Sequence, residues 1–210
     1  MILIINCTKG FEFVLIQNKK TIIKKKSRQL KSISEKLVVD IERALSKLKL
    51  NYKSIKEIVV ITGPGSFTGI RSAITFAKTL SIYLKIKVIG ISKFEVLNLL
   101  SMNDQKSKEK SIFVNNNQST FFLQKFNSSG EAISVPELVD LKEKGIKTSK
   151  KERIISDGLK LREYIDCGKK LKTVNLIEII GYRIEDIYKL SKQLSDKKYE
   201  VKPLYTKNLF

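Results

Sequence analysis

The chain has 210 residues and a formal net charge of +20, from 41 lysines and arginines against 21 aspartates and glutamates. It contains no histidine, which excludes Ser-His-Asp and Cys-His catalysis, HExxH zinc sites and His-ligated metals. Two cysteines are too few for a disulfide framework, and no apolar run is long enough for a transmembrane helix or a signal peptide. We therefore expect a cytoplasmic globular protein of one large domain or two small ones, without a membrane partner.

The positive charge has two interpretations. A polyanionic partner such as RNA would explain it, and so would a bias of the whole proteome toward lysine, isoleucine and asparagine. The basic residues are spread along the chain, with clusters at 24–31, 147–153 and 168–172. They do not alternate with aromatic residues as in RNA-recognition motifs. A basic module that binds RNA by itself is therefore kept as a rival hypothesis.

The N-terminal half shows a regular succession of strand and helix patterns. Apolar runs at 2–6 and 11–16, split by a short turn, predict a β-hairpin, and residues 21–26 extend it to three strands. From about residue 30 to 48, apolar residues recur every three or four positions, which predicts an amphipathic helix. Further along we expect a buried strand at 57–62, a helix rich in small residues at about 69–84, a strand at 87–91 and a helix at 92–100.

Residues 102–110 are polar and predict a linker between subdomains at 1–101 and 102–210. After the linker the strand and helix pattern restarts. The expected elements are strands at 111–116, 120–126 and near 132–135, a short helix from Glu137, a strand at 153–157, a helix from Leu176 to Leu194 and an extended tail. This repetition resembles the duplicated ribonuclease-H-like α/β fold of the actin, Hsp70 and sugar-kinase superfamily (ASKHA), with an eroded second half.

An uncharged glycine loop lies between the strand at 57–62 and the following helix. It comprises Gly63, Pro64, Gly65, Ser66, Phe67, Thr68 and Gly69, with Arg71 just beyond. Such a loop can cradle phosphate with backbone N–H groups, but the lysine of a P-loop is absent and the spacing is one residue longer than the dinucleotide pattern. The structural interpretation is a tight turn, in which glycines adopt positive φ, Ser66 or Thr68 caps the helix and Phe67 fills the core.

Residues 63–80, GPGSFTGIRSAITFAKTL, closely resemble the signature of the TsaB (YeaZ) family of Gcp-like domain proteins. The positions that match the family beyond the glycine loop are Arg71, Ala77, Lys78 and Leu80. SEK at 34–36 and VKPLYTK at 201–207 are similar to two shorter family motifs in the same order, with Ile33 where the family has histidine. The resemblance does not extend over residues 102–175.

The resemblance implies a role in adding a threonylcarbamoyl group to N6 of adenosine 37 in tRNAs that read ANN codons. TsaB-type proteins are the non-catalytic scaffold of this reaction. They pair with the catalytic paralogue TsaD and act with the ATPase TsaE, so that tRNA is engaged through the complex and ATP and metal belong to the partner subunit. The family therefore implies a chain that is not an enzyme, has no cofactor or metal of its own, and can form a homodimer when TsaD is absent.

Two asparagines agree with a non-catalytic role. In the actin-like superfamily, acidic groups on the first strand of each half hold the metal and the nucleotide phosphates, and this chain has Asn6 and Asn115 at those places. A neutral amide supplies no charge to a bound cation. The alternative function is a free-standing actin-like ATP-binding protein or kinase that uses the glycine loop. A peptidase is disfavoured because histidine and a metal-ligand cluster are missing.

The two N-terminal helices carry more apolar and small residues than one core-facing stripe requires. Ala73 and Ala77 lie one turn apart, so another helix could approach closely, although a stripe of small residues is also typical of a core. We expect these helices to form the surface for TsaD and for self-association. The expected interface residues are Leu37, Val38, Ile41, Leu45, Ala73, Ile74 and Ala77.

Overall fold

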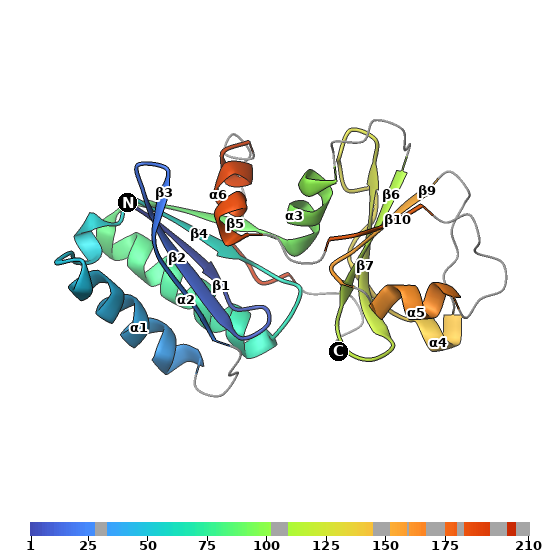
Figure 1. The fold of residues 1–210 in the computed structure, drawn as a ribbon, viewed down its shortest axis with the longest axis horizontal. Coiled ribbons are helices and arrows are strands. Elements are labelled where there is room, and N and C mark those ends of the chain that lie inside the picture. The colour runs from blue at the N-terminus through green and yellow to red at the C-terminus, as the bar shows by residue number, and fades with distance from the viewer. Residues whose placement is uncertain are drawn as a thin grey trace. The chain divides into compact units, whose positions relative to one another are not determined.

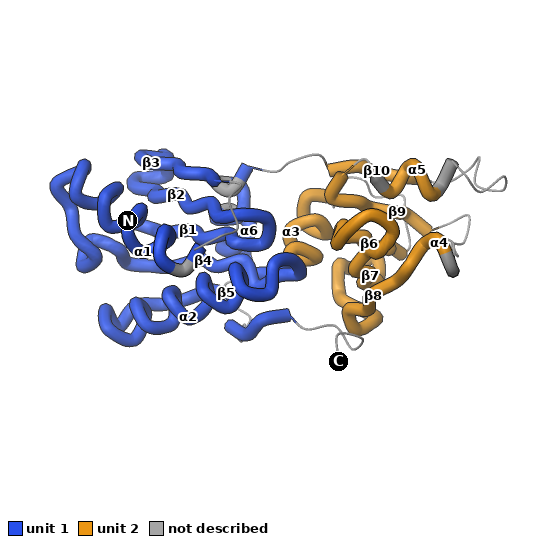
Figure 2. The backbone as a smooth tube through the Cα atoms, turned by 90° about the horizontal axis from the view of Figure 1, so that it is seen from below, with its two compact units in different colours: residues 1–92, 183–204 blue, residues 93–182, 205–210 orange. Residues whose placement is uncertain are grey.

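The computed structural model describes residues 1–27, 33–101, 109–144, 152–158, 160–166, 175–179, 183–193 and 201–204. The chain divides into two compact units. One comprises residues 1–92 and 183–204, and the other comprises residues 93–182 and 205–210 (Figure 2). Each unit is built on one sheet and is described by itself below.

The first unit contains a five-stranded mixed sheet with the strand order β3-β2-β1-β4-β5 (Figure 1). Its strands are β1 (Ile2–Asn6), β2 (Phe11–Gln17), β3 (Lys20–Ser27), β4 (Glu57–Ile61) and β5 (Lys87–Ile91). The first three form the predicted antiparallel meander, and β4 pairs in parallel with both β1 and β5. All the strands predicted in the N-terminal half are confirmed.

Helices cover both faces of the first sheet. On one face, α1 (Ile33–Lys47) and α2 (Phe67–Leu84) pack together over a core to which β1 contributes Leu3 and Ile5. Because side chains alternate along a strand, Ile4 points to the other face, where α6 (Ile184–Gln193) contacts β1 and β2 and buries Ile187. The helices predicted at about 30–48 and 69–84 are confirmed, except that residues 28–32 lie outside the described part. A short 3-10 turn, η1 (Tyr52–Ser54), follows α1.

The second unit repeats this topology. Its strands are β6 (Glu109–Asn115), β7 (Thr120–Asn127), β8 (Glu137–Asp140), β9 (Glu152–Ser156) and β10 (Asn175–Glu178), in the order β10-β9-β6-β7-β8. Again the first three strands are antiparallel, and the last two join in parallel. Where the first unit has helices of 15 and 18 residues, this one has α4 (Leu141–Lys144) and α5 (Lys160–Asp166), of 4 and 7 residues. The expected duplicated α/β fold with a reduced second half is confirmed.

The division between the units lies before the boundary expected at 101/102. The reason is α3 (Lys93–Leu100), which packs on β6 and β9 of the second sheet, while α6 returns to the first sheet. The sheet on which each helix packs therefore sets the division, and the position of a polar linker in the sequence does not reveal it. Among the described helices, none combines the length and the apolar character needed to cross a membrane.

Three predicted elements of the second half differ from the structure. Glu137 begins strand β8 rather than a helix, because residues 137–140 pair with β7, and the extended piece expected near 132–135 is reduced to a bridge between Ala132 and Phe126. The single helix expected from Leu176 to Leu194 is strand β10 followed by α6, because β10 pairs in parallel with β9. A helical spacing of isoleucines does not distinguish a helix from a short buried strand.

Candidate functional site

The glycine loop joins β4 to α2, as predicted, and is bonded to the turn between β1 and β2. Ser66 caps the helix: its Oγ accepts a hydrogen bond from the Gly69 N–H at 3.3 Å. The Ser66 N–H donates to the Thr8 carbonyl at 2.9 Å. Gly63 and Gly65 have φ angles of 119° and 154°. Two donors that could cradle a phosphate are therefore already satisfied within the protein.

The glycines permit close packing of this loop on the β1–β2 turn. A Cβ at Gly65 would lie 2.6 Å from the Thr8 carbonyl oxygen and 2.7 Å from the Thr8 Cβ. A Cβ at Gly69 would overlap the carbonyl oxygen of Cys7. Backbone approaches of this kind require glycine for steric reasons, so the spacing of these two glycines is explained without a ligand.

Phe67 does not fill the core, contrary to the sequence interpretation. Its side chain is 46% exposed, and the Arg71 guanidinium lies 3.7 Å from the centre of its ring. The position of Phe67 at the start of α2 directs it outward, and the buried Ile70 supplies the apolar contact beside Gly63 instead. Phe67 and Arg71 thus form an exposed cation–π pair next to the loop.

Asn6 is engaged in the turn that follows β1. Its Oδ1 accepts hydrogen bonds from the Thr8 N–H at 3.1 Å and from the Thr8 hydroxyl at 2.8 Å. Burial raises the pKa of the neighbouring Cys7 thiol to about 12, so this thiol is protonated at neutral pH and is a poor nucleophile. The end of β1 therefore offers neither a carboxylate nor a thiolate for catalysis.

Asn115 lies at the equivalent end of β6, beside a carboxylate that sequence reasoning missed. The Asn115 N–H donates to Oδ1 of Asp157 at 2.8 Å, and its side-chain amide donates to the Asn117 carbonyl at 3.0 Å. Oδ2 of Asp157 lies 2.7 Å from Nζ of Lys93, and both side chains are only 5% exposed. The carboxylate at this edge is thus neutralised by a lysine of the same unit. The described residues contain no cluster of three carboxylate or thiol groups that could hold a metal.

Most of the residues expected to form a partner interface are buried within the chain. Leu37, Ile41, Leu45, Ala73, Ile74 and Ala77 all belong to the core under α1 and α2 and are at most 5% exposed. They are unavailable because the two helices pack on each other as well as on the sheet. Val38, at 39% exposed, is the one expected interface residue that reaches the surface. For the other six, the interface prediction is wrong.

Other apolar residues on these helices and on η1 are partly or largely exposed. The Tyr52 hydroxyl donates to the Val38 carbonyl, and its ring packs edge-on against Phe76 of α2. Tyr83 lies two turns beyond Phe76 on the same side of α2 and is 70% exposed, next to Ile82 at 78%. These five residues, called the α1–α2 surface below, link both helices through η1.

Comparison with known proteins identifies the family. The family model described as TsaD, tRNA N6-adenosine threonylcarbamoyltransferase, matches residues 27–206. The chain belongs to this family. A relative, the tRNA threonylcarbamoyladenosine biosynthesis protein TsaB of Buchnera aphidicola subsp. Schizaphis graminum, is 32% identical over 102 residues, which are 49% of each protein. The match therefore spans about half the length of that relative.

Solved structures agree with this family assignment at the level of the fold. YeaZ from Pseudomonas aeruginosa superposes with a TM-score of 0.69 at 14% identity, covering 97% of this chain and 98% of YeaZ. A Bacteroides thetaiotaomicron protein with an actin-like ATPase fold gives a TM-score of 0.55 at 11% identity, covering 90% and 95%. The predicted TsaB (YeaZ) membership and the actin-like fold class are both confirmed.

The burial of Ala77 leads to a direct test of the corrected interface. We expect Ala77→Glu to destabilise the chain by about 4 kcal/mol or more, because it places a carboxylate without a partner in the core of this TsaB-like unit. Thr75→Glu adds the same charge on the exposed side of α2 and should change stability by less than about 0.5 kcal/mol. Thermal unfolding followed by circular dichroism measures both variants. If the Ala77→Glu protein is stable, Ala77 is accessible after all and can contact a partner.

Proposed function

We propose that this chain is a non-catalytic scaffold subunit of the complex that adds threonylcarbamoyl to N6 of adenosine 37 in ANN-decoding tRNAs. Its catalytic partner is a TsaD-type paralogue, and a TsaE-type ATPase acts with them in the cytoplasm. The family match and the printed name of the TsaB relative support the pathway. In this proposal ATP and metal bind to the partner subunits, and the chain carries no cofactor of its own.

The observation that carries the non-catalytic role is the state of the two strand ends at which an actin-like enzyme places carboxylates. Asn6 is neutral and closes a local turn. Asn115 is neutral, and the adjacent Asp157 is paired with Lys93 in a buried ion pair. A cation bound to ATP phosphates needs uncompensated oxygen ligands. The hydrogen-bonded glycine loop adds to this, because Ser66 and Gly69 already use their N–H groups.

The α1–α2 surface is our candidate contact for the TsaD-type partner and for self-association. Val38, Ile82 and Tyr83 of this surface are exposed, while other apolar residues of α1 and α2 fill the core beneath the helices. Exposed apolar groups that cluster on one face of a protein usually mark a partner site, and buried aromatic residues contribute strongly to binding energy at interfaces. The proposed interface thus lies on the same two helices as the sequence predicted, but it uses their outward-facing residues instead of their core-facing ones.

We expect Tyr83→Asp to weaken association with the TsaD-type paralogue by about 2 kcal/mol, roughly thirty-fold in Kd. Tyr83 is 70% exposed in the chain, so the free subunit should keep its thermal stability. Ile133→Asp is the matched control, because Ile133 is an exposed apolar residue of the second unit at 50%. Co-purification and calorimetry with the paralogue measure both variants. Undiminished binding by Tyr83→Asp would place the interface elsewhere.

The alternative function, a free-standing ATP-binding protein or kinase, is favoured by the likeness to an actin-like ATPase fold. Calorimetry with Mg-ATP distinguishes it from a scaffold. The scaffold proposal expects no micromolar binding and no ATP turnover by the purified chain. Micromolar Mg-ATP binding that is lost on substitution within residues 63–69 would support the alternative.

A further inference from the structure

β3 forms an outer edge of the first sheet and is strongly basic. Its eight residues include Lys20, Lys24, Lys25 and Lys26, all exposed, and no acidic residue. Within the described part of the chain, no strand pairs with its outer side. The hairpin tip before it adds Lys19 at a φ of 62°. Glycine is the residue usually favoured there, so Lys19 places a cation at this tip at some conformational cost.

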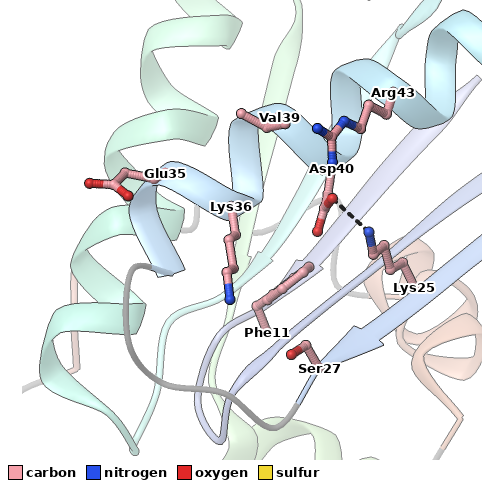
Figure 3. Close-up of a pocket in the computed structure, with 8 residues that line it drawn as sticks. All are labelled: Phe11, Lys25, Ser27, Glu35, Lys36, Val39, Asp40 and Arg43. Carbon is pink, nitrogen blue, oxygen red and sulfur yellow. Dashed lines mark ion pairs between the residues drawn. The ribbon is translucent and has the colours of Figure 1, made fainter.

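The lysines of β3 face two directions. Lys25 points toward α1, where its Nζ lies 2.6 Å from Asp40 (Figure 3). Lys24 and Lys26 point to the other side of the strand, about 7 Å apart along it, as residues two positions apart must. Lys24 also lies 3.5 Å from Glu12. The Lys24 side chain is 40% exposed and that of Glu12 is 14% exposed, and Glu12 is also the cross-strand partner of Lys26. This face of the strand therefore carries two lysines against one carboxylate.

A groove between β3 and α1 continues the basic surface. It has a volume of about 980 Å³, and its charged lining consists of Lys24, Lys25, Arg43 and Lys47 against Asp40 and Glu42. Asp40 is already paired with Lys25. A smaller hollow of about 380 Å³ beside it adds Lys36 and Glu35 from α1 (Figure 3). Both walls of the groove therefore carry cations, Lys25 on β3 and Arg43 and Lys47 on α1. The side chains of Lys24 and Lys26 add cations on the other face of the same edge strand.

Charged residues on an edge strand, lysines especially, also prevent the edge from pairing with another sheet, so these lysines protect the edge as well. Here every charge on β3 is positive, and three consecutive lysines present cations on both sides of the strand. A protein strand added to this edge would need matching apolar side chains. A nucleic-acid backbone, which is anionic along its whole length, needs none.

We propose that β3 and the adjoining groove contact the phosphate backbone of tRNA, with Lys24 and Lys26 each reaching one phosphate. This inference rests on the proposed function, which supplies tRNA as the polyanion. The contact is independent of base sequence, because lysines on phosphates position a nucleic acid without reading it. It adds a direct tRNA contact by this subunit to the contacts made by the rest of the complex.

The test is binding of an ANN-decoding tRNA transcript by the full chain, measured by fluorescence anisotropy from low to physiological salt. Lys24→Gln/Lys26→Gln should weaken binding and reduce the slope of log affinity against log salt by about 2, one for each lost phosphate contact. Lys53→Gln/Lys56→Gln removes the same charge from exposed positions outside β3 and outside the lining of the groove, and should leave the slope nearly unchanged. Equal slopes for both variants, or no tRNA binding by the chain, would overturn the proposal.

Binding to the TsaD-type paralogue is measured on the same variants. Unchanged association, with a reduced tRNA slope, supports both the inference and the proposed function. Loss of paralogue binding with normal tRNA binding assigns this edge to an acidic protein surface and overturns the inference. A reduced tRNA slope in a chain that never binds the paralogue keeps the RNA contact and refutes the scaffold function. Thermal unfolding of both variants verifies that the fold is intact.

Discussion

Gly65→Ala is expected to destabilise the chain by about 3 kcal/mol, or to prevent folding. The added Cβ would lie 2.6 Å from the Thr8 carbonyl oxygen, at a φ of 154° that side chains rarely adopt. Gly69→Ala should have a similar effect, because its Cβ would meet the Cys7 carbonyl oxygen. The second variant is the sharper test, since alanine favours a helix over glycine by about 1 kcal/mol. Any loss of stability must then come from the clash.

Gly158→Ala is the matched control, because a Cβ there meets no atom within 4 Å. Its stability should change by less than about 0.5 kcal/mol. For a chain of this size, 3 kcal/mol corresponds to a fall in Tm of roughly 10 °C. If Gly65→Ala and Gly69→Ala fold with normal stability, the loop is more pliable than the packing indicates. Nucleotide binding would then return as the reason for its glycines.

The strands of the first half could be predicted because the local sequence is typical of buried strands. The runs that became β1, β4 and β5 are short and apolar and end at polar or glycine residues, as buried strands do. The helix cap at Ser66 was also readable, since serine before a helix commonly accepts the early N–H groups. In the second half, β8 and β10 are four residues long and depend on pairing with β7 and β9. Pairing between distant segments leaves no local pattern.

The interface prediction failed for a different physical reason. A helix face that packs in the core and a helix face that binds a partner both need apolar residues. The apolar spacing in the sequence is the same for both. Leu45 and Ala77 are buried because α1 and α2 pack on one another. Ile82 and Tyr83 are exposed although they continue the same apolar stretch. Only the rotation of α2 on the sheet distinguishes these cases, and packing in three dimensions determines that rotation.

The sequence predicted only part of the arrangement at the end of β6. Asn115 showed that a carboxylate was missing, but nothing in the pattern connected Asp157 with Lys93. These residues are separated by 64 positions and meet because α3 packs on β6 and β9. Lysine is rarely buried unless it is paired, so Lys93 at the start of a predicted helix reads as a surface residue. Tertiary contact alone reveals its role.

Asp157→Ala is therefore expected to destabilise the second unit by about 3–5 kcal/mol. Removing the carboxylate leaves the Lys93 ammonium, 5% exposed, without its charged partner 2.7 Å away. It also leaves the Asn115 N–H without its acceptor. Asp157→Asn keeps an acceptor for that N–H and should still lose most of this stability, because the uncompensated charge dominates. Chemical denaturation, followed by circular dichroism, measures the change.

The double variant Lys93→Met/Asp157→Asn separates the charge from the rest of the site. It removes both ions and keeps an acceptor for the Asn115 N–H, so it should recover most of the loss, as neutral replacements of buried ion pairs often do. Arg162→Ala is the control for an exposed pair, because Arg162 lies 3.6 Å from Glu178 with 61% of its side chain exposed. Its effect should stay near 0.5 kcal/mol. If the double variant is as unstable as Asp157→Asn, the loss arises from packing around α3 rather than from a buried charge. The pairing of Asp157 with Lys93 would then no longer count as support for the non-catalytic scaffold role.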